Sequence, residues 1–125
     1  MADYPETITF FEWLAPKILA GEKHITIRDY AESHYRPGTR VTAYTLETHH
    51  RFADIEIISV EPLFVEDIDE NHAEQEGLAL EQLQGLIRRI YPDQHQLYVL
   101  KFRLLPDVTT ATPVASANSS ADEQG

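Results

Sequence analysis

The chain contains no cysteine, and this absence removes several kinds of chemistry at the outset. Without a thiol there is no thiolate nucleophile, no disulfide framework and no cysteine-ligated zinc site. Any covalent catalysis must therefore use a serine, threonine, lysine or carboxylate side chain. The lack of cysteine does not by itself indicate a cellular compartment.

Basic residues are also scarce, because 10 lysines and arginines stand against 21 acidic residues and the net charge is −11 at pH 7. A surface of this sign repels a phosphate backbone, so a polynucleotide is a disfavoured partner, although a local basic patch would be compatible with the total. No apolar run approaches membrane-spanning length, and the first 25 residues contain no signal-peptide core. We therefore expect a cytoplasmic protein that does not associate with membranes.

The common catalytic motifs are missing as well. The sequence has no glycine-rich phosphate loop, no H-E-x-x-H pair and no nucleophile elbow. His49 and His50 are adjacent, but neighbouring residues on a turn point apart and no further ligands can be identified. We expect neither a metal ion nor a cofactor, and no protein partner is indicated.

What is present is enough for one compact domain, since 42% of the 125 residues are hydrophobic. We place this domain at residues 1–105. Residues 106–125 are rich in alanine, threonine, serine and proline and carry acids but no lysine or arginine. Such a low-complexity segment buries too little apolar surface to offset its ordering entropy, so it is predicted to be a disordered acidic tail.

Hydrophobic periodicity predicts the element order strand, helix, three strands, two helices, strand. The expected strands cover residues 7–10, 24–28, 41–45, 52–61 and 96–104, and the expected helices cover residues 11–20, 66–76 and 80–90. This is an α+β plan in which a small β-barrel of mixed strands is capped by helices. Pro16 either kinks the first helix or marks a later start. Phe11 and Trp13 are expected to pack in the core.

The segment from Lys23 to Arg28 is the strongest candidate for chemistry. Its period-two alternation places Ile25 and Ile27 on one strand face and Thr26 and Arg28 on the other. A threonine hydroxyl becomes a nucleophile when a base takes its proton, and a neutral lysine is one of the few bases available here. Burial and a neighbouring arginine both favour the neutral amine. The competing interpretation makes Lys23 a solvated turn residue and the other two ordinary surface residues.

Glu76 is a second candidate, because it lies at the end of the acidic helix, just before Gly77. The negative end of the helix macrodipole favours a protonated carboxyl group, which is then poised to donate a proton. The competing interpretation is a solvent-facing glutamate in an acidic run.

Several short motifs in combination resemble one family. They are Ile8-Thr9-Phe10-Phe11, Ile18-Leu19-Ala20-Gly21, Lys23, Ile25-Thr26-Ile27-Arg28-Asp29, Glu32-Ser33-His34, His72-Ala73-Glu74-Gln75-Glu76, Ile90-Tyr91-Pro92 and Tyr98-Val99-Leu100-Lys101-Phe102. Together they resemble the bacterial N(4)-acetylcytidine amidohydrolases, small members of the ASCH superfamily with a PUA-like barrel, and the match runs over about residues 6–105.

The resemblance implies an amidohydrolase that converts N(4)-acetylcytidine to cytidine and acetate. It implies Lys23 as general base, Thr26 as nucleophile and Glu76 as proton donor. It further implies that Arg28, Ser33 and His34 bind the substrate and that no metal takes part. The departures from the family pattern, such as Pro16 in the first helix, do not touch the three proposed catalytic positions.

Two other functions remain open at the level of sequence. The first is a non-catalytic ASCH or PUA-like module that holds RNA or a modified nucleoside in the same cleft. The second is an acidic adaptor that binds a basic protein through the helix at residues 66–76. The sequence also leaves open the preferred form of the substrate, a covalent acyl intermediate on Thr26, and the oligomeric state.

Overall fold

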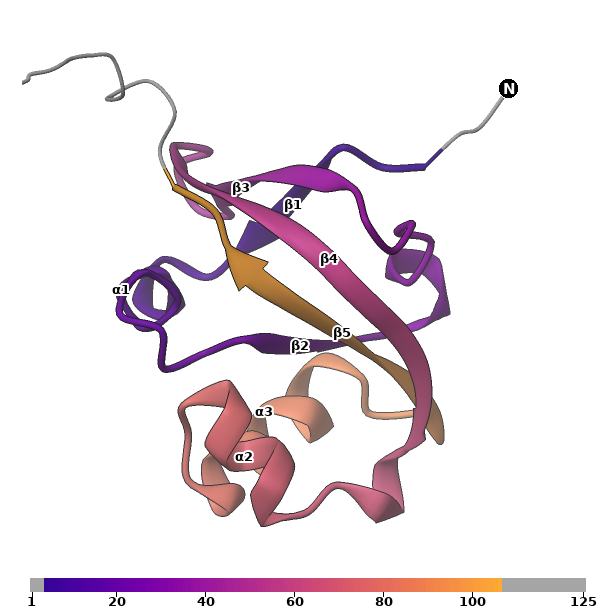
Figure 1. Cartoon of the computed structure of the whole chain (residues 1–125). Helices are drawn as coiled ribbons and strands as arrows, with labels where there is room; N and C mark the ends of the chain where they lie inside the picture. Colours follow the sequence, from indigo (N-terminus) through magenta and orange to yellow (C-terminus); the bar gives the residue numbers. More distant parts are fainter. Residues whose placement is uncertain (1–3, 107–125) are drawn as a thin grey trace, which may run out of the picture.

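The computed structural model describes residues 4–106, which form a five-stranded sheet with helices at one end and one side (Figure 1). The strand order across the sheet is β1-β3-β4-β5-β2. β1 pairs in parallel with β3, and every other neighbouring pair is antiparallel. The strands are β1 (Thr7–Phe10), β2 (Ile25–Arg28), β3 (Arg40–Thr45), β4 (Arg51–Phe64) and β5 (Gln96–Leu104).

Three helices complete the domain, and α2 and α3 lie side by side beyond β2 (Figure 1). The order of strands and helices along the chain confirms the predicted α+β plan. The helices are α1 (Ala15–Leu19), α2 (Glu70–Glu76) and α3 (Leu80–Ile90), with single 3-10 turns at Glu12–Leu14, Tyr30–Glu32 and Val65–Asp67.

The expectation of a closed barrel is wrong, because the sheet is open between β1 and β2. Each of these edge strands has four residues, and each pairs with one neighbour only. A side chain bridges the two edges instead, since Arg28 Nη2 donates a hydrogen bond to the Thr9 carbonyl oxygen at 2.7 Å. The gap between the edges is therefore bridged by a side chain and not by strand pairing.

Two helix starts differ from the sequence prediction for local reasons. Pro16 lies in the first turn of α1, where its missing N–H costs nothing, so it marks the start of the helix rather than a kink. α2 begins at Glu70 instead of residue 66 because the Asp69 carboxylate accepts hydrogen bonds from the backbone N–H groups of Asn71 and His72. The preceding residues form a 3-10 turn.

The apolar side chains form two clusters on opposite sides of the gap. The larger cluster packs β1, β3, β4 and β5 against α1, and the smaller one packs β2 and the start of β5 against α2 and α3. Trp13 does not belong to either cluster and is exposed, which corrects its assignment to the core; Phe11 is half-buried. The 3-10 turn at Glu12–Leu14 turns Leu14 inward and leaves Trp13 on the outside.

No helix within residues 4–106 is long and apolar enough to cross a bilayer. The predicted tail, apart from its first residue, lies outside the described residues.

We expect the fully buried Ile55 in β4 to dominate the stability of the larger cluster. Ile55→Ala should lower the free energy of unfolding by about 2–5 kcal/mol, because it removes buried methylene groups and leaves a cavity. The matched control is Ile58→Ala on the same strand, whose side chain is exposed. Urea denaturation measures both, and equal losses in the two variants would contradict the assignment of the core.

Candidate functional site

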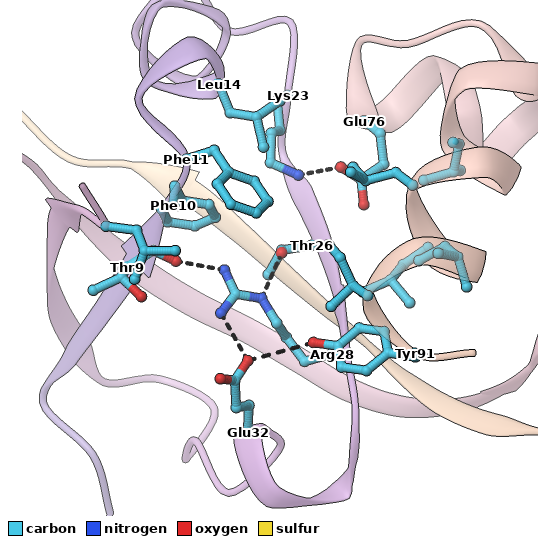
Figure 2. Close-up of a pocket in the computed structure, with 16 residues that line it drawn as sticks. Thr9, Phe10, Phe11, Leu14, Lys23, Thr26, Arg28, Glu32, Glu76 and Tyr91 are labelled. Carbon is cyan, nitrogen blue, oxygen red and sulfur yellow. Dashed lines mark hydrogen bonds and ion pairs between the residues drawn. The ribbon is translucent and has the colours of Figure 1, made fainter. Parts of the chain in front are cut away.

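A cavity of about 170 Å³ occupies the gap between β1, β2 and the two C-terminal helices. Its lining combines a group of polar side chains with mainly apolar ones (Figure 2). The lining residues are Thr9, Phe10, Phe11, Leu14, Lys23, Thr26, Ile27, Arg28, Glu32, Leu46, Glu76, Leu83, Leu86, Ile87, Ile90 and Tyr91.

Lys23 enters this cavity from the turn that joins α1 to β2. Its backbone N–H donates to the carbonyl of Lys17 at 3.1 Å, which holds the turn against the preceding helix. The side chain is only 2% exposed. Its ammonium nitrogen donates to the Ile25 carbonyl at 2.7 Å and pairs with Glu76 Oε1. The predicted alternative, a solvated turn lysine, is therefore excluded.

Burial lowers the pKa of the Lys23 ammonium below its ordinary value of 10.5. The Glu76 carboxylate opposes this shift, whereas the Arg28 guanidinium adds to it. The physical reason is that a charged amine loses its hydration in the cavity and a second cation stands nearby. The neutral amine is consequently easier to form here than in water.

Glu76 is the last residue of α2, and its position depends on Gly77. Gly77 has φ = 72°, a left-handed conformation that ends the helix without strain in glycine. A Cβ atom at this position would lie 3.1 Å from the backbone oxygen of Glu22. The end of α2 thus packs directly against the turn that carries Lys23, and a hydrogen bond from His24 N–H to the Gln75 carbonyl at 2.9 Å adds to this contact.

Thr26 and Arg28 extend from the same side of β2, as the alternation predicts (Figure 2). Thr26 is buried, and its Oγ1 accepts a hydrogen bond from Arg28 Nε at 2.9 Å. The Arg28 side chain is only 12% exposed, and its guanidinium lies 5.0 Å from the centre of the Phe10 ring. A hydroxyl group therefore has a permanently charged donor on one side and shares its cavity with a buried amine.

Glu32 and Tyr91 stand at the other end of the guanidinium. Glu32 Oε1 accepts from Arg28 Nη1 at 3.1 Å and receives the Tyr91 hydroxyl at 3.5 Å. Burial, together with the Glu32 carboxylate, raises the pKa of Tyr91 to about 12. The phenol therefore remains a hydrogen-bond donor at any physiological pH.

The structure brings four of the six predicted site residues together and separates two. Lys23, Thr26, Arg28 and Glu76 all line the cavity, whereas Ser33 and His34 do not. The Ser33 hydroxyl donates to the Tyr30 carbonyl at 2.8 Å, and the His34 ring packs edge-on against Tyr30.

Sequence reasoning did not assign Glu32, Tyr91 or any residue of α3 to the site. Leu83 and Ile87 do belong to the core, but together with Leu86 and Ile90 they also line the cavity. The sequence feature that could have identified Glu32 is its position four residues after Arg28, with which it forms an ion pair.

Within residues 4–106, no three histidine, cysteine, aspartate or glutamate side chains come together as a metal-ligand cluster. His49 is stacked on the Tyr44 ring, with the ring centroids 4.4 Å apart. The predicted lack of a metal remains a prediction.

Several curated proteins with similar sequences carry the same name. Those named "N(4)-acetylcytidine amidohydrolase" include proteins of Vibrio campbellii, 53% identical over 84% of this chain and 99% of the relative, and Vibrio parahaemolyticus, 51% identical over 84% and 98%. A protein of the same name from Haemophilus influenzae is 39% identical over 81% of this chain and 97% of its own length.

Solved structures resemble the fold at low sequence identity. An ASCH domain from Lactobacillus crispatus superposes with a TM-score of 0.67 at 19% identity, over 81% of this chain and 80% of that domain. A protein of Enterococcus faecalis gives a TM-score of 0.68 at 16% identity, over 84% and 78%. No protein-family model matches the chain. The fold is accordingly that of ASCH domains, and by its sequence the chain belongs to the N(4)-acetylcytidine amidohydrolase family.

Proposed function

We propose that this protein hydrolyses N(4)-acetylcytidine to cytidine and acetate. The observation that carries the proposal is the buried Lys23–Glu76 pair in the same cavity as the Thr26 hydroxyl. The shared name of the curated relatives supports the substrate. The cavity supplies a base, a nucleophile and an acid without requiring a cysteine.

The first step uses the single proton that Lys23 and Glu76 hold between them. When this proton resides on the Glu76 carboxyl group, the Lys23 amine is neutral and accepts the proton of the Thr26 hydroxyl. Thr26 Oγ1 then forms a bond to the acetyl carbonyl carbon. Burial favours this neutral arrangement because it avoids two separate charges in a poorly hydrated cavity.

Glu76 completes the first half of the reaction by giving its proton to the exocyclic nitrogen as the carbon–nitrogen bond breaks. Cytidine leaves with an amino group, and the acetyl group stays on Thr26 as an ester. A water molecule then attacks this ester, with the same residues moving its protons, and releases acetate. The leaving nitrogen is conjugated to the pyrimidine ring, so less assistance is needed than for a peptide bond.

Arg28 supports the nucleophile in two ways. Its Nε–H occupies one lone pair of Thr26 Oγ1, so the threonine's own hydrogen must point elsewhere in the cavity. The guanidinium stays protonated throughout, so it stabilises the negative charge that develops on this oxygen and cannot itself act as the base.

The apolar walls suit a flat heterocycle. Phe10 and Phe11 line the cavity (Figure 2). Leu83, Leu86 and Ile87 of α3 also line it. A pyrimidine ring between these walls leaves the polar row along β2 and α2 for the amide.

Purified protein should release cytidine from N(4)-acetylcytidine, and three near-isosteric variants should be impaired. We expect Lys23→Met, Thr26→Val and Glu76→Gln each to lower kcat/KM by about 100-fold or more, the range for loss of general acid–base or nucleophilic assistance. Chromatographic detection of cytidine measures the rates. Circular dichroism must show that each variant is folded.

The matched control is Lys17→Met, because Lys17 lies in the same region but outside the cavity lining. Its activity should equal that of the wild type. Wild-type turnover with full activity in all three cavity variants would refute the assigned roles while leaving the activity intact.

The dependence on pH should report the lowered pKa of Lys23. The active pair holds one proton, and its loss to solvent leaves Glu76 with no proton to donate. The kcat/KM should therefore fall as pH rises, with the midpoint of the fall below the ordinary lysine value of 10.5. Replacing Arg28 with glutamine removes a cation that lowers this pKa, so the fall should move to higher pH. Initial rates between about pH 5 and pH 11 test both statements. A wild-type rate that stays level beyond pH 10.5 would exclude the Lys23–Glu76 proton from the mechanism.

A further inference from the structure

The polar groups of the cavity form a row that leads from the interior to the solvent (Figure 2). At the inner end, the side chains of Lys23 and Glu76 are 2% and 5% exposed. Further along the row, the Arg28 side chain is 12% exposed and that of Glu32 is 53% exposed. The reacting groups are therefore at the closed end, and a carboxylate marks the open end.

Glu32 is held in place through only one of its two oxygens. Oε1 takes the bonds from Arg28 and Tyr91, at 3.1 and 3.5 Å. No side chain or backbone group in residues 4–106 donates to Oε2. A carboxylate oxygen accepts hydrogen bonds and never donates them, so this position is open to a donor such as a hydroxyl group of a bound molecule.

The geometry of a cytosine nucleoside decides which part of the substrate reaches Glu32. The amide is carried by C4 and the sugar by N1, on opposite sides of the pyrimidine ring. With the amide at Thr26, the sugar must point away from it, toward the open end of the cavity. The Arg28 guanidinium contacts Thr26 at one end and Glu32 at the other. A pyrimidine ring placed alongside the guanidinium therefore extends from Thr26 toward Glu32.

Among the substrate's polar groups, the sugar hydroxyls are the ones that fit this carboxylate. The O2 carbonyl oxygen and N3 of the base are acceptors, and they would meet Glu32 without a hydrogen bond. A hydroxyl group, in contrast, donates readily to a carboxylate, as in the recognition of ribose by acidic residues in dinucleotide-binding domains.

Resting on the proposed function, we propose that Glu32 is a specificity-determining residue that accepts hydrogen bonds from the sugar hydroxyls of the nucleoside. Arg28 and Tyr91 fix its carboxylate in advance, so little ordering is needed when the sugar arrives. This contact favours nucleosides over the free acetylated base.

The test compares two substrates, N(4)-acetylcytidine and N(4)-acetylcytosine, which lacks the sugar. The variant is Glu32→Gln, whose amide oxygen keeps an acceptor for Arg28 but lacks the charge. We expect the kcat/KM for the nucleoside, divided by that for the free base, to fall by about tenfold or more in this variant. The change should come mainly from a higher KM for the nucleoside, because the variant loses a hydrogen bond to a charged group.

The matched control is Glu81→Gln, an exposed glutamate of α3 that does not line the cavity, and its ratio should equal that of the wild type. If Glu32→Gln lowers both substrates by the same factor, Glu32 merely holds Arg28 and the proposal is wrong.

Failure of the proposed function would appear differently, as absence of turnover of either substrate by the wild type. In that case calorimetric titration with cytidine and cytosine replaces kinetics. Tighter binding of cytidine that is lost in Glu32→Gln supports the role of Glu32, and equal binding of the two, or binding of neither, overturns it.

Discussion

A lysine ammonium buried in a protein interior costs several kcal/mol unless other groups replace its water. In this fold the Lys23 nitrogen meets the Ile25 carbonyl and the Glu76 carboxylate, and this pairing dictates much of the surrounding structure. It requires α2 to end where it does, it requires the turn after α1 to approach that end, and it keeps the inner part of the cavity out of contact with bulk water. The same burial that makes the pairing necessary also makes the neutral amine accessible, so structural and chemical roles come from one cause.

The open sheet explains why the cavity lies where it does. Strands at a sheet edge present unpaired carbonyl groups that must find donors. The Thr9 carbonyl of β1 is satisfied by Arg28, and the Ile25 carbonyl of β2 is satisfied by Lys23. The two cations therefore stand where hydrogen-bonded strands would otherwise close a barrel. The overall fold of the sheet and helices is that of ASCH domains of known structure.

Local patterns in the sequence were sufficient for the element order and for the orientation of β2, because alternation assigns Thr26 and Arg28 to one face irrespective of the rest of the fold. They were not sufficient for barrel closure, which depends on whether two short strands distant in sequence come within pairing distance. Local patterns also could not distinguish a buried Lys23 from a solvated one, since its partner is 53 residues away.

The role of Glu32 in the site was missed for the same reason, because its hydrogen bond to Tyr91 links residues that are 59 positions apart. Trp13 was misplaced because a 3-10 turn breaks the helical spacing that suggested burial.

The close approach of Gly77 to the backbone of Glu22 has a consequence for the life of the folded chain. Because α2 docks on the very turn that carries Lys23, any local opening that releases this helix hydrates the amine and removes its carboxylate partner in a single event. An opened or incompletely folded molecule thus carries an ordinary ammonium group that has no lone pair with which to accept a proton. Under the proposed mechanism, a damaged copy would therefore become chemically inert before it becomes fully unfolded.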